Sequence, residues 1–226
     1  MELTNELVEF YGILTGDGCI SKYKDGERIR RAIRIDGNSL TDKFYFNHIK
    51  ALIKSILNKE VTVRYRNYGN NIFITFENKQ FAIFLHNKLG FPYGKKKNKL
   101  KLPKRIIDNN ENLKYFLRGF FDTDGCIYFT KNNSNSRNYP IIELSTHDAY
   151  LLSKIKNILK NKGFNVIISH FKDSIKLHGK KNVTKWMKEI GSSNIDKSSK
   201  YLFWKRYRYC PKIDELNLRN RLNKIR

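Results

Sequence analysis

Apolar positions at the start of the chain follow first the helical period and then the strand period. Thr4 or Asn5 can cap a helix that carries Leu7 and Tyr11 on one face. This helix is expected to end at the glycine–aspartate–glycine sequence of residues 16–18, because glycine is a poor helix former. Charged and apolar residues then alternate, which is typical of strands with one buried face.

The rest of the first half completes the order αββαββα. Two of its segments follow the helical period, and four are rich in β-branched and aromatic residues that alternate with polar ones. The predicted helices cover residues 42–57 and 79–89, and the predicted strands cover residues 19–24, 28–36, 61–67 and 72–77.

The same order begins again at residue 113, which indicates an internal duplication. Asp17, the glycine after it, and the next cysteine and isoleucine all recur from Asp124 onward. A lysine-rich segment with two prolines separates the copies and is typical of a linker. We therefore predict a first repeat over residues 1–91, a basic linker over 92–112, a second repeat over 113–200 and a basic aromatic tail over 201–226.

This order of strands and helices favours the α+β class, with a curved antiparallel sheet in each repeat and helices on one face of it. Gly12 and Gly16 lie four residues apart in the first helix, and Gly119 matches Gly12 in the second copy. Glycine inside a helix costs about 1 kcal/mol relative to alanine. We interpret these glycines as a close contact between the two helices, which would join two pseudo-symmetric repeats.

The charge of the chain points to a polyanion as its partner. Lys and Arg number 45 against 21 Asp and Glu, a formal net charge of +24. Nucleic acid is the partner that such an excess favours. We find no signal peptide and no apolar stretch of about 18 residues, so we expect no membrane association and an intracellular protein, in the cytoplasm or an organelle matrix. Three cysteines without metal spacing argue against a disulfide framework or a zinc site, and Cys19 and Cys126 are expected to be buried.

One face of each predicted sheet is polar, and in the first repeat it is rich in arginine. Strands that present alternate side chains can enter a major groove, where arginine suits guanine. The alternative is a face that is merely solvated. The residues expected to face DNA are Arg28, Arg30, Arg34, Asp36, Arg64 and Arg66 in the first repeat and Tyr128, Thr130, Glu143, Ser145, Lys176 and His178 in the second.

The two acidic turns stand out against this basic background. If the glycine-containing helices pack side by side, their C-terminal ends bring Asp17 and Asp124 together. Two carboxylates beside the negative ends of two helix dipoles repel each other unless a proton or a cation lies between them. A divalent cation with oxygen ligands resolves this conflict and suits phosphodiester hydrolysis. We therefore expect Mg²⁺, with Mn²⁺ as its substitute.

The sequences FYGILTGDG, from residue 10, and LRGFFDTDG, from residue 117, resemble the LAGLIDADG motif. The whole chain resembles a monomeric LAGLIDADG homing endonuclease, which carries two such motifs. The resemblance implies that Asp17 and Asp124 bind the catalytic metals and that the backbone carbonyls of Gly16 and Thr123 assist. Thr15 departs from the motif at the position where Asp122 keeps its acid, a position that is structural in the family.

The resemblance also implies one basic residue in each active site. In the segment GKKKNKLKLP, from residue 94, it points to Lys96 with Lys97 as a neighbour, and in IGSSNIDKSSKY, from residue 190, to Lys197 rather than Lys200. Such a lysine would orient the attacking water or neutralise charge on the phosphate. The alternative is a plain contact to a DNA phosphate. Asp36 and Ser145 are expected to hold water near the site.

These observations predict a homing endonuclease, of intron or intein origin, that makes a metal-dependent double-strand break at a long asymmetric DNA site and acts as a monomer. The alternative is a non-cleaving module with the same fold, either a maturase whose partner is intron RNA or a DNA-binding regulator. The tail sequence KYLFWKRYRYC, from residue 200, leaves two interpretations open. It either stacks on nucleic acid or forms a helix that packs Leu202, Trp204 and Tyr207 onto the body.

Overall fold

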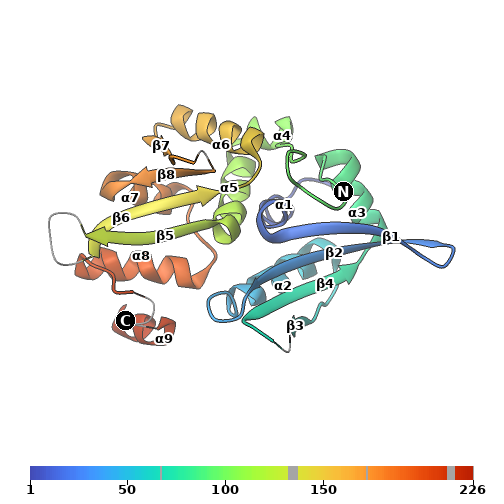
Figure 1. Ribbon diagram of the computed structural model, residues 1–226, viewed down its shortest axis with the longest axis horizontal. Helices are drawn as coiled ribbons and strands as arrows, with labels where there is room; N and C mark the ends of the chain where they lie inside the picture. Colours follow the sequence, from blue (N-terminus) through green and yellow to red (C-terminus); the bar gives the residue numbers. More distant parts are fainter. Residues whose placement is uncertain (67, 132–136, 172, 213–216, 226) are drawn as a thin grey trace.

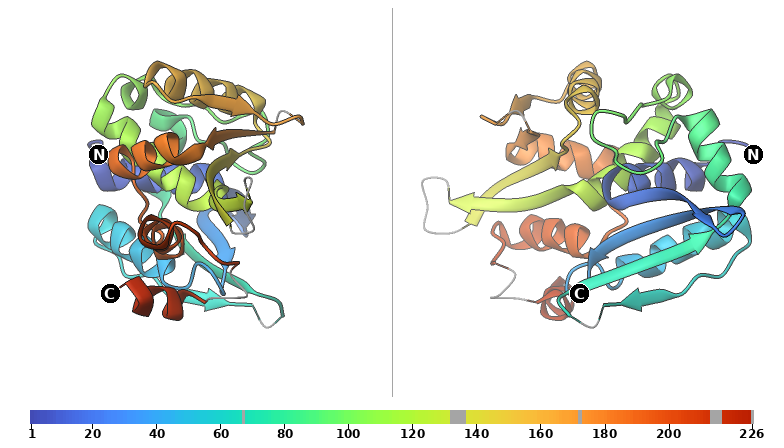
Figure 2. Two further views of the ribbon diagram at one scale, coloured as in Figure 1. Left: turned by 90° about the vertical axis from the view of Figure 1, so that its left-hand side faces the viewer. Right: turned by 45° about the vertical axis from the view of Figure 1, so that its right-hand side comes forward.

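The computed structural model describes residues 1–66, 68–131, 137–171, 173–212 and 217–225. Its strands form two separate antiparallel sheets of four strands each (Figure 1). In the left-hand view of Figure 2 the strands lie along one side of the molecule and most helices along the other. The predicted α+β class with two pseudo-symmetric repeats is confirmed.

The first repeat has the predicted order αββαββα, and its sheet has the strand order β1-β2-β4-β3. The long hairpin of β1 and β2 pairs Gly18 with Ile35 and Asp25 with Arg28. The elements are α1 (Asn5–Asp17), β1 (Gly18–Asp25), β2 (Arg28–Asn38), α2 (Tyr45–Leu57), β3 (Val63–Tyr65), β4 (Asn71–Glu77) and α3 (Lys79–Leu89).

The second repeat has the same order, and its sheet has the equivalent strand order β5-β6-β8-β7. Its elements are α5 (Asn110–Asp124), β5 (Gly125–Lys131), β6 (Arg137–Ser145), α6 (Ala149–Asn161), β7 (Val166–Ile168), β8 (Ser174–His178) and α7 (Gly179–Glu189). The short helix α4 (Lys104–Ile107) lies between the repeats, and α8 (Ile195–Tyr207) and α9 (Leu218–Ile225) follow the second one.

Helix α1 begins and ends where its sequence predicts. The Thr4 hydroxyl accepts a hydrogen bond from the Leu7 amide at 3.3 Å, and the amide of Gly18 caps the other end by donating to the Leu14 carbonyl. Every residue from position 7 to 16 is buried, so α1 is a central helix and not an amphipathic surface helix. Its partner in the centre of the molecule is α5 (Figure 1).

The contact between α1 and α5 depends on glycine. A Cβ atom at Gly12 would lie 2.9 Å from the Phe120 amide nitrogen and closer still to the Phe116 carbonyl oxygen. A Cβ atom at Gly119 would meet α1 in the same way, 3.0 Å from the Ile13 amide nitrogen. The two backbones therefore touch directly, and the predicted glycine contact between the repeats is confirmed.

Three local predictions differ from the structure. Helix α2 begins at Tyr45 and not at residue 42, because Asp42 instead accepts a hydrogen bond from the Asn38 amide in a turn. In the tail, Trp204 packs into the core and donates to the Asn138 carbonyl, as the helix interpretation requires, whereas Leu202 and Tyr207 are exposed. Cys126 is exposed and Cys19 is only partly buried, so the expectation that both are buried was wrong.

Candidate active site and nucleic-acid interface

The site begins where α1 and α5 end. Asp17 and Asp124 are the last residues of these two helices, and each is followed by the first strand of its repeat. A Cβ atom at Gly16 would lie 3.2 Å from the Asp124 amide nitrogen, so the two helix ends are in contact. The glycine contact thus brings together two acidic residues that are far apart in the sequence, as predicted.

Both carboxylates are difficult to ionise in this position. Burial, together with the charges of Asp124 and Asp42, raises the pKa of Asp17 to about 7. Burial also raises the pKa of Asp124. Asp17 nevertheless keeps more than a third of its surface open to water, which weakens the repulsion between the charges. The pair therefore lies in a partly open site that a cation can reach.

Lys96 and Lys197 each lie against the C-terminal end of the motif helix in their own repeat. The Lys96 ammonium donates to the carbonyls of Leu14 at 3.3 Å, Thr15 at 3.0 Å and Gly16. Cations at this position stabilise a helix, because the last carbonyls have no partner within the helix and the dipole is negative there. Burial lowers the pKa of the Lys96 ammonium.

Lys197 does the same for α5 from an even more buried position. Its ammonium donates at 2.6 Å to the carbonyls of Phe121 and Gly125, and at 3.4 Å to that of Thr123. Burial lowers the pKa of this lysine as well. Lys200 instead pairs with Asp196 at 2.6 Å, so Lys197 is the lysine of this segment that reaches the motif helix.

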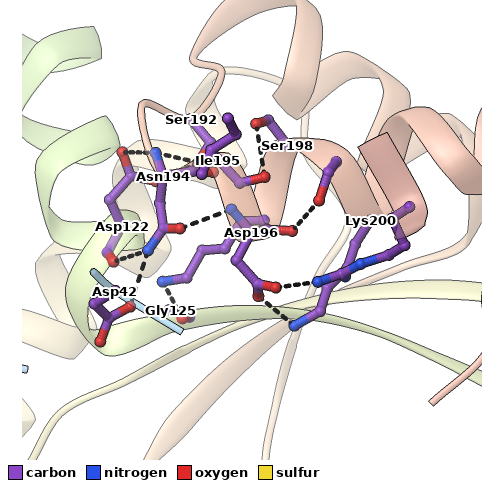
Figure 3. A network of polar contacts seen from close by, with 12 residues as sticks. Asp42, Asp122, Gly125, Ser192, Asn194, Ile195, Asp196, Ser198 and Lys200 are labelled. Carbon is purple, nitrogen blue, oxygen red and sulfur yellow. Dashed lines mark hydrogen bonds and ion pairs between the residues drawn. The ribbon is translucent and has the colours of Figure 1, made fainter. Parts of the chain in front are cut away.

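The buried acid Asp122 anchors the loop that carries Lys197. Figure 3 shows its carboxylate facing Asn194 and Ser192. It accepts hydrogen bonds from the Ser193 amide at 2.7 Å and the Asn194 amide at 3.2 Å, and also from the Ser192 hydroxyl. Burial raises the pKa of Asp122 to about 6. Asp122 therefore has a structural role here, which explains why the first repeat can have Thr15 at the same position.

Polar contacts also connect each lysine-bearing segment to the opposite repeat, which the sequence did not predict. The Asn194 side chain donates to Asp42 at 3.2 Å (Figure 3), and the Leu100 amide donates to Asp148 at 3.1 Å. Asp42 and Asp148 each precede the second helix of their repeat. Both bonds join residues about 50 to 150 positions apart, so no local pattern in the sequence signalled them. The two lysine segments are thus held by both repeats.

The donor set suits a hard divalent cation shared with a phosphate. Among the described residues no group of three or more His, Cys, Asp or Glu side chains could hold a metal by itself. Asp17 and Asp124 supply two carboxylates whose mutual repulsion a cation would relieve, and a nucleic-acid phosphate and water would supply the remaining oxygen ligands. The carbonyls of Gly16 and Thr123 already accept from lysine, and their participation as metal ligands stays a prediction.

The polar face of the first sheet carries the predicted arginines. By register, Arg34 lies opposite Cys19 and Thr75, and Arg64 lies opposite Phe73. Arg34 binds Asp36 through two hydrogen bonds, of 2.6 and 2.8 Å, and its guanidinium lies 4.2 Å from the centre of the Phe73 ring. The residues of this face are Arg28, Arg30, Arg34, Asp36 and Arg64, with Arg66 just beyond β3.

The polar face of the second sheet has a different chemistry. Glu143 lies at its centre and accepts from the Tyr128 hydroxyl at 3.1 Å and the Ser174 hydroxyl at 2.5 Å, with Lys176 at 3.5 Å. The predicted residues on this face are Tyr128, Thr130, Glu143, Ser145, Lys176 and His178. The two faces therefore present unlike surfaces, one rich in arginine and one built around a glutamate.

Comparisons with known proteins agree with this architecture. A family model described as a LAGLIDADG-like domain matches residues 111–200. The crystal structure of I-DmoI in complex with DNA and Mn has a TM-score of 0.57 and 18% sequence identity, covering 84% of this chain and 97% of that one. The I-LtrWI LAGLIDADG homing endonuclease bound to target DNA has a TM-score of 0.57 and 14% identity, covering 98% of this chain and 96% of that one. The LAGLIDADG meganuclease I-AabMI bound to uncleaved DNA has a TM-score of 0.56 and 13% identity, covering 90% of this chain and 90% of that one.

A comparison with curated protein sequences gave no match. Residues 111–200 thus match a LAGLIDADG-like domain, and the chain has the two-domain fold of the LAGLIDADG homing endonucleases. In the part of the chain that the structure describes, no helix has both the length and the apolar character needed to cross a membrane.

Proposed function

We propose that this protein is a site-specific DNA endonuclease that makes a metal-dependent double-strand break at a long asymmetric site. One observation carries the proposal. Asp17 and Asp124 lie at the touching C-terminal ends of the two central helices, between two sheets whose polar faces can bind DNA. A purely structural helix contact would not require two carboxylates where two helix dipoles are negative.

The sheets would bind the duplex on either side of these aspartates. Paired strands can enter the major groove and place every second side chain against base edges. The first sheet would offer Arg28, Arg34 and Arg64, whereas the second would offer the Glu143 cluster. Because the two surfaces differ, the two half-sites would differ in sequence, and a single chain would bind both.

Asp17 and Asp124 would hold the divalent metal, and Mg²⁺ is the ion we propose, with Mn²⁺ as its substitute. Solved structures of I-DmoI are complexes with DNA and Mn or Ca, and that of one variant was determined in the presence of Mg, which supports the use of a divalent ion. When bound, such an ion activates water for attack on a phosphodiester and stabilises the leaving oxygen. Lys96 and Lys197 hold the two helix ends and would place positive charge beside the phosphate.

The experiment that tests this proposal is a cleavage selection. The purified chain would be incubated with a library of random duplexes and Mg²⁺ or Mn²⁺, and cut ends would be sequenced. We expect one preferred asymmetric site cut in both strands by a monomer, as measured by sedimentation with and without DNA. Tight binding to one duplex without cutting under either metal would contradict the endonuclease and favour the DNA-binding regulator. Preferential binding to a structured intron RNA would favour the maturase.

A further inference from the structure

A cavity of about 550 Å³ opens beside Asp124 on one side of the candidate active site. Two segments far apart in the sequence form most of its wall. The linker contributes Lys95, Lys96 and Lys97, and the turn between β6 and α6 contributes Thr146 and His147. The helix ends complete it with Gly16 and Asp124, so the cavity adjoins the position where DNA would be cut.

The cavity wall presents several hydrogen-bond donors and one available acid. Lys95, Lys97 and His147 are exposed, whereas Lys96 is held by carbonyls of α1. The Thr146 hydroxyl accepts from the Asp148 amide at 3.2 Å, which leaves its own proton free to donate. The sequence did not predict that these groups would lie together.

The second acid of the wall, Asp148, is not available to repel an anion. It is only 2% exposed and its carboxylate accepts from the Leu100 amide at 3.1 Å and the Leu151 amide at 3.0 Å. Backbone donors therefore satisfy it inside the protein. Among the acids of the wall, Asp124 alone remains as a free carboxylate, and as the last residue of α5 it belongs to the candidate metal site.

We propose that this cavity binds one backbone phosphate of the target DNA, on one strand, next to the phosphate that is cut beside Asp124. This inference rests on the proposed function. Lysine, histidine and threonine are side chains that contact phosphate oxygens and fix the register of a protein on the duplex. A phosphodiester between two nucleotides fits the size of the cavity better than a free anion, because a single phosphate would leave most of about 550 Å³ unfilled.

The site is specific to one strand because the two repeats differ at this turn. Thr41 occupies the position before Asp42 that His147 occupies before Asp148. In the first repeat the side chain of Asn194 also binds Asp42, whereas Asp148 is bound by a backbone amide of the linker. Ser198 follows Lys197 where Lys97 follows Lys96, so the equivalent segment and turn of the other repeat carry neither the lysine nor the histidine of this donor pair.

Single neutral phosphates in the DNA test the proposal directly. Duplexes of the preferred site would each carry one methylphosphonate, placed in turn at every position around the cut in either strand. Their affinities would be measured without metal for the wild type and for the double variant Lys97→Gln/His147→Gln. Both positions are exposed, so we expect the variant to fold, which circular dichroism and thermal unfolding would check. Thr41→Val and Lys180→Ala serve as controls for the equivalent turn and for a lysine on α7.

We expect one phosphate position, in one strand, at which the methylphosphonate weakens DNA binding by the wild type about tenfold. The same methylphosphonate should leave the affinity of the double variant unchanged. The controls should retain the wild-type pattern. The slope of log affinity against log salt should fall by about 1 in the double variant, as one ionic contact is lost.

Each of the following results would overturn the proposal. The double variant could lose the same affinity as the wild type wherever the methylphosphonate is placed, which would show no coupling to any one phosphate. It could also show coupling to a methylphosphonate at matching positions in both strands. Saturable binding of inorganic phosphate by the DNA-free protein, without coupling to any DNA phosphate, would assign the cavity to a free anion instead. Failure of the wild type to bind any duplex would contradict the proposed function itself, whereas binding and cutting without coupling would contradict only this site.

Discussion

Replacing Gly12 with alanine adds a methyl group between the two central helices. The new Cβ would lie 2.9 Å from the Phe120 amide nitrogen and nearer still to the Phe116 carbonyl oxygen, whereas ordinary van der Waals contact begins at 3.4 Å. Both of these atoms belong to the backbone of α5, so no side chain can rotate away. The helices must therefore separate by about 1 Å in an interior that is close-packed.

Two opposing effects determine the change in the free energy of unfolding. On an exposed helix, replacing glycine with alanine stabilises by about 1 kcal/mol. Overpacking a core costs about 1 to 3 kcal/mol, and a contact between two backbones lies at the upper end of this range. For Gly12→Ala we therefore expect a net loss of about 2 kcal/mol. Cleavage should fall as well, because the same separation moves Asp17 away from Asp124.

Urea unfolding followed by circular dichroism measures this change. Gly119→Ala is the matched variant on α5, where the Cβ would lie 3.0 Å from the Ile13 amide nitrogen, and it should lose a similar amount. The double variant should lose less than the sum, because helices that are already apart accept the second methyl group more easily. Ser153→Ala on the exposed face of α6 is the control for helix propensity and should be slightly stabilising. A gain of about 1 kcal/mol in Gly12→Ala would refute the reasoning, because it would show that the helices do not touch there.

Four further predictions concern charge at the site. Asp17→Asn and Asp124→Asn should each abolish double-strand cleavage while metal-free affinity for DNA persists or rises; full cleavage by either variant would contradict the assignment. Lys96→Met and Lys197→Met should each lower the free energy of unfolding by about 1 to 3 kcal/mol, because buried carbonyls lose their donor, and Lys97→Met should not. Affinity for DNA should fall about a thousandfold between roughly 50 and 200 mM salt, and a flat response in a binding titration would show that the charge serves another purpose. The pKa of Asp17 is raised from 3.8 to about 7, so ionising this carboxyl group destabilises the folded state. The loss of stability is complete above about pH 7 and becomes smaller as the pH falls. The melting temperature of Asp17→Asn should therefore exceed that of the wild type by more at about pH 8 than at about pH 5, and equal differences would contradict the raised pKa.

The sequence by itself determined the order of the elements and their duplication. Helical and strand periods are local properties of the chain, so residues 5–17 and 79–89 could be recognised as helices without knowledge of their neighbours. The glycines of α1 and α5 were informative for a similar reason, since a residue that weakens a helix needs a compensating contact. Together with the acids that follow them, they predicted that Asp17 and Asp124 would meet.

Only the tertiary structure decided what the lysines and the turns of the two repeats contact. Lys96 and Lys197 were expected near phosphate, but their ammonium groups are held by carbonyls at the ends of α1 and α5. The bond from Asn194 to Asp42 joins the two repeats, and the bond from Leu100 to Asp148 joins the linker to the second repeat. The cavity likewise brings linker lysines beside Asp124 and His147. Such contacts leave no periodic signal in the sequence, because they depend on how closely two helices approach and on which loops that approach brings together.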